Sequence, residues 1–125
     1  DKDYENLLSI VEAEAGGEDL EGRIMVADVI LNRVANDQFP DNVTSVIWDR
    51  TGGSPQFSPT EDGRIYTVTV SDDTREAVNR AIDGEDLSQG ALYFIARDQA
   101  DEKNVKWFDE KLTFLFEHGG HSFYA

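Results

Sequence analysis

The sequence contains no cysteine and no long apolar run. Without cysteine the protein has no disulfide bonds, no thiolate ligands for a metal and no cysteine nucleophile. No apolar stretch approaches the ~20 residues that a helix needs to cross a bilayer. The first residues, Asp1 to Tyr4, also lack the positively charged and then apolar order of an export signal. We therefore expect no insertion into a membrane.

Basic residues are scarce as well. The 125 residues include 26 acids but only 11 lysines and arginines, which gives a formal net charge of −15. A field of that sign repels phosphate groups, so nucleic acid and anionic membrane surfaces are unfavourable partners. The hydrophobic content of 39% includes seven Phe, four Tyr and two Trp, which is enough for a packed core. We expect a single domain over residues 1–125, present as a monomer.

Motifs of several catalytic and binding classes are missing. The serines lack the Gly-x-Ser-x-Gly context of a hydrolase nucleophile, and there is no glycine-rich phosphate loop. His118 and His121 flank a Gly-Gly turn, but a zinc site needs three or four converging ligands and no H-E-x-x-H motif is present. We therefore predict no metal and no cofactor, and assign the histidines to the turn or to substrate contact.

Hydrophobic periodicity predicts an α+β fold, with a mainly helical body followed by a small antiparallel β-sheet. The expected helices are Asp3–Ala15, Glu21–Ala35, a short one from Asn42 to Trp48, and Asp72–Asp83. The expected extended segments are Arg64–Val70, Gly90–Ile95, and a hairpin of Leu112–Phe116 and Ser122–Tyr124 with glycine at positive φ in its turn. The second helix is apolar nearly all round, as a buried central helix is. Asp28 and Asn32 share one flank of it, where a structural hydrogen-bonding role is favoured over a cleft.

Glu14 is a carboxylate in the middle of the apolar face of the first helix. At about 100° per residue, it shares that face with Leu7, Leu8, Ile10, Val11 and Ala15. Glu5 and Glu12 fall on the opposite, solvated face. A glutamate turned toward a core is costly unless it is paired, protonated or at the wall of a cleft. Two interpretations stay open at this point: a structural carboxylate, or a general acid whose pKa is raised by burial.

Aromatic and amide side chains later in the chain are candidates for a sugar-binding groove. Aromatic rings stack on sugar faces, and amides hydrogen-bond hydroxyl and acetamido groups. Core packing is the competing interpretation for each ring. The candidate substrate-binding residues are Gln56, Phe57, Ser58, Tyr93, Trp107, His121 and Tyr124.

Several of these segments together resemble a known family. The stretch Glu14–Gly22, followed by Val26–Val34 and Phe39-Pro40, resembles the opening motif of the SleB/CwlJ-type cell wall hydrolases, the spore-cortex-lytic family. Gly90–Phe94, then Trp107 and Gly120–Tyr124, resemble its middle and closing motifs in the same order. The resemblance implies a lysozyme-like or transglycosylase-like domain that acts on peptidoglycan outside the cytoplasm, in the cell wall or spore cortex. It also implies that Glu14 is the catalytic glutamate.

The implied reaction cleaves the bond between N-acetylmuramic acid and N-acetylglucosamine, and two routes are open. A lytic transglycosylase needs one carboxylate and leaves 1,6-anhydro-muramoyl ends. A muramidase needs an activated water, for which Glu18 or Asp28 is the nearest second acid; we favour the one-carboxylate route because Glu18 follows a Gly-Gly turn and is expected to be exposed. A catalytically silent peptidoglycan-binding module and an acidic interaction domain are the alternatives of another class. The choice between cortex and vegetative wall is open.

Overall fold

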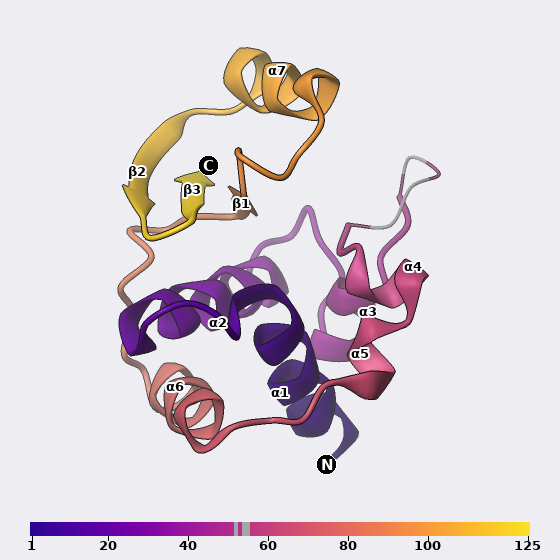
Figure 1. Cartoon of the computed structure of the whole chain (residues 1–125), viewed down its shortest axis with the longest axis vertical. Helices are drawn as coiled ribbons and strands as arrows, with labels where there is room; N and C mark the ends of the chain where they lie inside the picture. Colours follow the sequence, from indigo (N-terminus) through magenta and orange to yellow (C-terminus); the bar gives the residue numbers. More distant parts are fainter. Residues whose placement is uncertain (52, 54–55) are drawn as a thin grey trace.

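The computed structural model describes residues 1–51, 53 and 56–125 and shows a helical body carrying a small sheet (Figure 1). The helices are α1 (Lys2–Ala15), α2 (Leu20–Val34), α3 (Val43–Ile47), α4 (Pro59–Asp62), α5 (Arg64–Thr67), α6 (Asp72–Ile82) and α7 (Glu102–Lys111). The strands are β1 (Tyr93–Ile95), β2 (Phe114–His118) and β3 (His121–Tyr124). This is the α+β class that the sequence predicts. No helix among the described residues is both long and apolar enough to cross a bilayer.

The body is built around α2, which packs against α1, α3 and α6. Its first turn is capped by Asp19, whose Oδ1 accepts the N–H of Gly22 at 2.8 Å, as an N-cap aspartate does. Arg23 in the next turn donates to the carbonyl oxygens of Ala15 and Gly16, at 3.3 and 2.6 Å. These bonds satisfy the free carbonyls at the end of α1. They hold the end of α1, with Glu14 in its last turn, at a fixed place against α2.

The sheet is antiparallel, with β3 in the centre between β1 and β2. All four residues of β3 are buried. The turn between β2 and β3 has Gly119 at φ +56°, the backbone region that favours glycine, as the hairpin prediction requires. Two contacts tie this turn to the loop between α1 and α2. Glu18 accepts the N–H of Gly120 at 3.0 Å, and Asp19 pairs with His118 at 2.8 Å.

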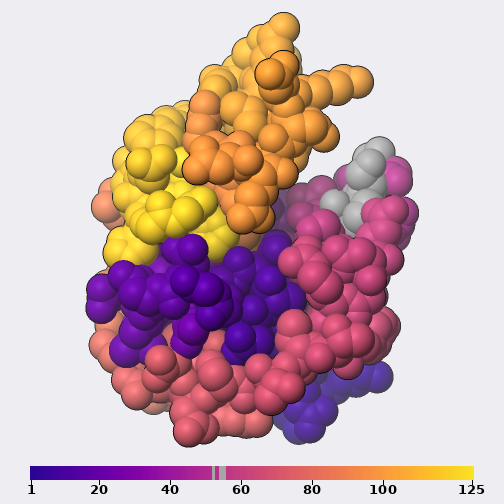
Figure 2. All heavy atoms as spheres, viewed as in Figure 1, coloured from indigo at the N-terminus to yellow at the C-terminus, as the bar shows by residue number. Residues whose placement is uncertain are grey.

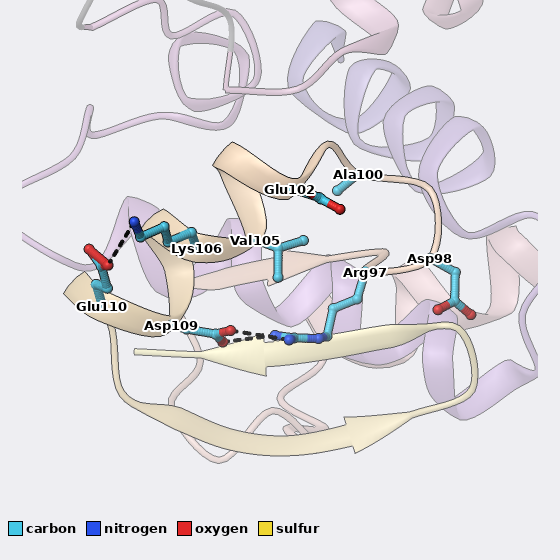
Figure 3. A pocket seen from close by; sticks show the side chains of 8 residues that line it. All are labelled: Arg97, Asp98, Ala100, Glu102, Val105, Lys106, Asp109 and Glu110. Carbon is cyan, nitrogen blue, oxygen red and sulfur yellow. Dashed lines mark hydrogen bonds and ion pairs between the residues drawn. The ribbon is translucent and has the colours of Figure 1, made fainter.

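Helix α7 stands beyond the sheet at the far end of the molecule (Figure 1) and has no buried residue. Phe108 fastens it through edge-to-face contacts with Tyr93 and Tyr124, at centroid distances of 6.2 and 5.2 Å. An ion pair of 2.8 Å joins Asp109 to Arg97 across a cavity of about 460 Å³ (Figure 3). Glu14 is not among the residues that line this cavity. Within the cap, defined here as residues 93–125, α7 is therefore held on the sheet by aromatic contacts and an ion pair.

Three expectations are corrected. The segment Arg64–Val70 begins as the helical turn α5, not as a strand, because Asp62 bonds the backbone N–H and guanidinium of Arg64 and Ile65 packs inward. Helices α4 and α7 were not predicted. Glu12 is half-buried, not solvated, and its Oε1 accepts from the Ser71 N–H and the Thr74 hydroxyl at 2.9 and 2.8 Å. It thereby joins α1 to the first turn of α6.

Candidate active site

Glu14 lies on the wall of a cleft between the body and the cap. The molecule is hollowed between the orange segment that contains α7 and the pink segment that contains α4 and α5 (Figure 2). The cleft has two lobes, of about 430 and 740 Å³. Both lobes are lined by Glu14, Gln56, Phe94, Ile95 and Asn104. The carboxyl group of the apolar helix face thus meets a space large enough for a ligand.

Burial raises the pKa of Glu14 from 4.5 to about 7. The nearby Arg64 guanidinium opposes this rise and the Asp62 carboxylate adds to it, but loss of water contact is the largest cause. A carboxyl group with such a pKa is still partly protonated at neutral pH and is able to donate its proton. The structure therefore supports the general-acid interpretation of Glu14 over the structural one.

His121 stands beside Glu14 in the larger lobe and is 6% exposed. Burial lowers its pKa, although the Glu18 charge and a hydrogen bond with the Glu14 backbone oppose the shift. Its ring meets Phe94 edge-to-face at 5.2 Å. Its Nδ1 atom is buried and has no hydrogen-bond partner among the described residues. His121 is therefore a neutral imidazole in the cleft wall, and its unpaired Nδ1 faces the interior.

Two further carboxylates line the larger lobe, and both bond to backbone N–H groups. Glu18 accepts from Gly120 in the hairpin turn. Asp101 accepts from Asn104 at 2.7 Å and caps α7. Asp28, the other candidate for a second acid, lies outside the cleft lining and is 3% exposed. Glu14 is the acid in this cleft that has a raised pKa and a free path to a ligand.

Most of the sequence-predicted groove residues do meet at the cleft. Phe57, Tyr93 and Trp107 line the smaller lobe, with Tyr93 and Trp107 edge-to-face at 6.4 Å. Trp107 is 45% exposed, so its ring is accessible to a ligand, whereas Phe57 is 2% exposed and supports the wall from behind. Gln56 lines both lobes; Ser58 and His121 line the larger one.

Tyr124 is a correction, because it does not line the cleft. Its side chain is completely buried beneath α7. Its hydroxyl group accepts from Arg97 at 2.6 Å and donates to Asp109 at 3.1 Å. Tyr124 is a structural residue of the cap.

Asp28 and Asn32 have the structural role that the sequence favours, although their partners lie in the loop before β1. Asp28 accepts the N–H of Leu87 at 2.9 Å, and Asn32 donates to the Ala91 carbonyl and the Ser88 hydroxyl, both at 2.9 Å. They brace that loop against α2. Burial raises the pKa of Asp28 to about 7.

Sequence reasoning missed several residues of the cleft lining, among them Arg33, Arg64, Phe94 and Asn104. Arg33 carried a signal, since it is a charged residue near the end of a helix that is otherwise apolar all round. Asn104 carried none, because it is a polar residue in a mostly polar helix that the sequence did not reveal.

One cluster has the residue types of a metal site. Oxygen or nitrogen atoms of Asp19, Glu21 and His118 lie within 4.8 Å of one another at the surface. The Asp19 carboxylate already accepts from the Gly22 N–H and pairs with His118, and these bonds explain its lowered pKa. The cluster lies at the hairpin turn and contributes no residue to the cleft lining.

Comparisons with known proteins point to one family. A family model described as Cell Wall Hydrolase matches residues 17–124, starting just after Glu14. The chain is 40% identical to the spore cortex-lytic enzyme of Halalkalibacterium halodurans over 100 residues, 80% of this chain and 29% of the relative. It is also 40% identical to that of Bacillus subtilis over 98 residues, 78% of this chain and 30% of the relative. The chain thus spans less than a third of the length of these two relatives.

Solved structures agree over nearly the whole chain. The catalytic domain of the germination-specific lytic transglycosylase SleB from Bacillus anthracis superimposes with a TM-score of 0.82 at 32% identity, covering 98% of this chain and 93% of that domain. The catalytic domain of Bacillus cereus SleB gives a TM-score of 0.78, also at 32% identity, with coverages of 100% and 91%. A transglycosylase-like fold is confirmed, and this chain belongs to the cell wall hydrolase family.

Proposed function

We propose that this chain cleaves peptidoglycan glycan strands between N-acetylmuramic acid and N-acetylglucosamine as a lytic transglycosylase, with Glu14 as acid and then base. The observation that carries the proposal is a cleft-wall carboxyl group whose pKa is raised to about 7. The names of the relatives, spore cortex-lytic enzyme and lytic transglycosylase, support the same chemistry. A cortex substrate outside the cytoplasm is part of this proposal.

In the first step, protonated Glu14 donates its proton to the glycosidic oxygen. The bond between that oxygen and C1 of the muramoyl residue breaks, and positive charge develops at C1. The N-acetylglucosamine then leaves as an alcohol. Burial of Glu14 supplies the protonated form that this step consumes, because the ionised carboxylate would be poorly solvated there.

In the second step, the ionised Glu14 accepts the proton of the muramoyl C6 hydroxyl. The C6 oxygen bonds to C1, which closes the 1,6-anhydro ring and restores protonated Glu14. Glu18 and Asp101 accept backbone N–H groups, so the route that needs one carboxylate fits this cleft better than a route with a second acid.

The remaining wall suits a ligand of sugar rings and amides. Trp107 and Tyr93 offer apolar ring faces, which stack on pyranose rings. His121 and Ser58 offer neutral hydrogen-bonding groups in the larger lobe. These groups support the proposal of a groove for N-acetylated sugars.

Mass spectrometry of digested peptidoglycan tests the proposal. We expect anhydro-muramoyl ends, and we expect Glu14→Gln to lower the rate about 10²- to 10⁴-fold, the usual range for a general acid. Glu5→Gln is the matched control, because Glu5 is exposed on the same helix.

The other outcomes are equally informative. Reducing ends would identify a muramidase instead. Absence of any cleavage by the wild-type protein, with retained glycan binding, would identify a silent binding module.

A further inference from the structure

Arg33, in the last turn of α2, is a buried cation in the wall of the catalytic cleft. It is 4% exposed and lines the same lobe as Glu14. Its guanidinium carbon lies 4.8, 5.2 and 5.0 Å from the ring centroids of Phe39, Phe57 and Tyr93. Burial lowers its pKa to about 10, which still leaves it charged at neutral pH. It has no carboxylate within ion-pair distance among the described residues.

A buried charge of this kind is costly, so its bonds indicate what it does. Nε donates to the carbonyl oxygen of Leu92 at 2.7 Å, just before β1, and this bond is structural. Nη1 donates to Oε1 of Gln56 at 3.3 Å. Unlike Leu92, Gln56 is exposed and lines both lobes of the cleft, so a ligand could reach its side chain.

The bond to Arg33 fixes which way the Gln56 amide points. A guanidinium has donors and no acceptor, so the atom of Gln56 that faces it must be the oxygen. The backbone of Gln56 is held as well, because its N–H donates to the Asp49 carbonyl at 3.0 Å. The two donors of the NH₂ group are not used by this bond, and Gln56 itself is exposed at the cleft. Gln56 thereby acts as a donor toward a ligand.

We propose that Arg33 is a positioning residue that makes Gln56 a donor for the acetamido carbonyl oxygen of an N-acetylated sugar bound beside Glu14. A plain sugar hydroxyl both donates and accepts, so it gains less from a site that only donates. The inference rests on the proposed function, since it assumes a glycan in this cleft. It adds a reason why the cleft prefers N-acetylated sugars.

Binding to the inert Glu14→Gln protein tests the proposal without turnover. The probes are two neutral β-1,4-linked pentasaccharides, one of N-acetylglucosamine and one of glucose, compared by titration calorimetry. We expect the acetylated probe to bind more tightly. Adding Gln56→Glu should lower the ratio of the two affinities at least tenfold, because a carboxylate cannot donate a hydrogen bond. The melting temperature should be unchanged or higher, because the introduced carboxylate would pair with Arg33.

Two further variants complete the test. Gln38→Glu adds the same charge at an exposed position outside the cleft and should leave both affinities unchanged. Arg33→Lys should lower the preference severalfold, since a lysine is a single point charge that holds the amide less firmly. The same change in a Gln56→Ala background should have no further effect.

The proposal is overturned if Gln56→Glu keeps the preference, or if Arg33→Lys lowers it equally without Gln56. These results are separate from the proposed function. That function fails if the wild-type protein does not cleave peptidoglycan, whatever the two probes show.

Discussion

The body and the cap form opposite sides of the cleft, and they are held together by different forces. In the body, α2 is buried on nearly all sides and packs against three helices. In the cap, α7 buries no residue and depends on Phe108 and the Arg97–Asp109 ion pair. The acid Glu14 belongs to the tightly packed side, and Trp107 to the loosely packed one. In the proposed function, the proton donor therefore lies on a packed helix of the body, and the exposed Trp107 ring lies on a helix that buries no residue.

The largest effect should come from a fully buried aromatic residue of the cap. Tyr124→Ala removes a fully buried ring that contacts Phe108 and Phe114, at 5.2 and 5.6 Å between centroids. We expect the free energy of unfolding in urea to fall by about 3–5 kcal/mol. If the variant is stable but binds glycan weakly, Tyr124 contacts the ligand and is not a structural residue of the cap.

The next effect concerns the body and depends on pH. Because the pKa of Glu14 is raised from 4.5 to about 7, the wild-type protein loses stability as pH rises through that window. Glu14→Gln has no charge to bury, so we expect equal stability near pH 4 and a gain of about 1–3 kcal/mol at pH 8. Thermal melts across that range measure it. A difference in melting temperature that stays the same from pH 4 to pH 8 would contradict the raised pKa of Glu14.

A Trp107 variant tests whether α7 of the cap contributes to glycan binding. Trp107→Ala should weaken cleavage or glycan binding about tenfold, the loss expected for one stacking contact. The melting temperature should stay nearly constant, because the side chain is 45% exposed. If unfolding changes and activity per folded molecule does not, α7 is only structural.

Glu12 is the counterpart of Glu14 on the same helix, with a pKa shift of opposite sign. Hydrogen bonds from Ser71 and Thr74 outweigh burial and lower its pKa. The contribution of Glu12 to the free energy of unfolding is therefore present above pH 4.5 and is lost as the pH falls through its lowered pKa. Glu12→Gln should cost about 1 kcal/mol near pH 7 and leave activity per folded molecule intact. A large loss of turnover would mean that both glutamates serve the reaction.

The smallest effect is expected from chelation. The three possible ligands Asp19, Glu21 and His118 lie where the start of α2 meets the hairpin turn, and none of them lines the cleft. Cleavage should therefore be the same with and without EDTA. Loss of activity that zinc or calcium restores would make this turn part of the functional site.

The body could be predicted from the sequence because its information is local. The apolar pattern of α2 and the wheel position of Glu14 follow from residues a few places apart. Predicted helix ends agree with the observed ones to within one or two residues. The raised pKa of Glu14 follows from the same pattern, since an apolar face is also a desolvated one.

Other parts of the chain could not be predicted in the same way, although the strands of the cap were. Helix α7 is mostly polar and buries no residue, so its sequence carries too little apolar signal to be recognised as a helix. In the body, Ile65 and Tyr66 favour a strand by composition, but the bonds between Asp62 and Arg64 determine the turn. Tyr124 was assigned to the groove because nothing in the local sequence shows that β3 is central and covered.

The ties between distant parts of the chain have a consequence for synthesis. Glu18 and Gly120 are 102 residues apart, and His121 meets the backbone of Glu14 only when β3 is in place. A nascent chain therefore carries its acid from the start but lacks a complete cleft until β3 has emerged. In the proposed function, a fragment that ends before His118 would carry the acid but would lack His121 and the turn that holds Glu18. Assembly of the cleft thus depends on a strand about a hundred residues away from its acid.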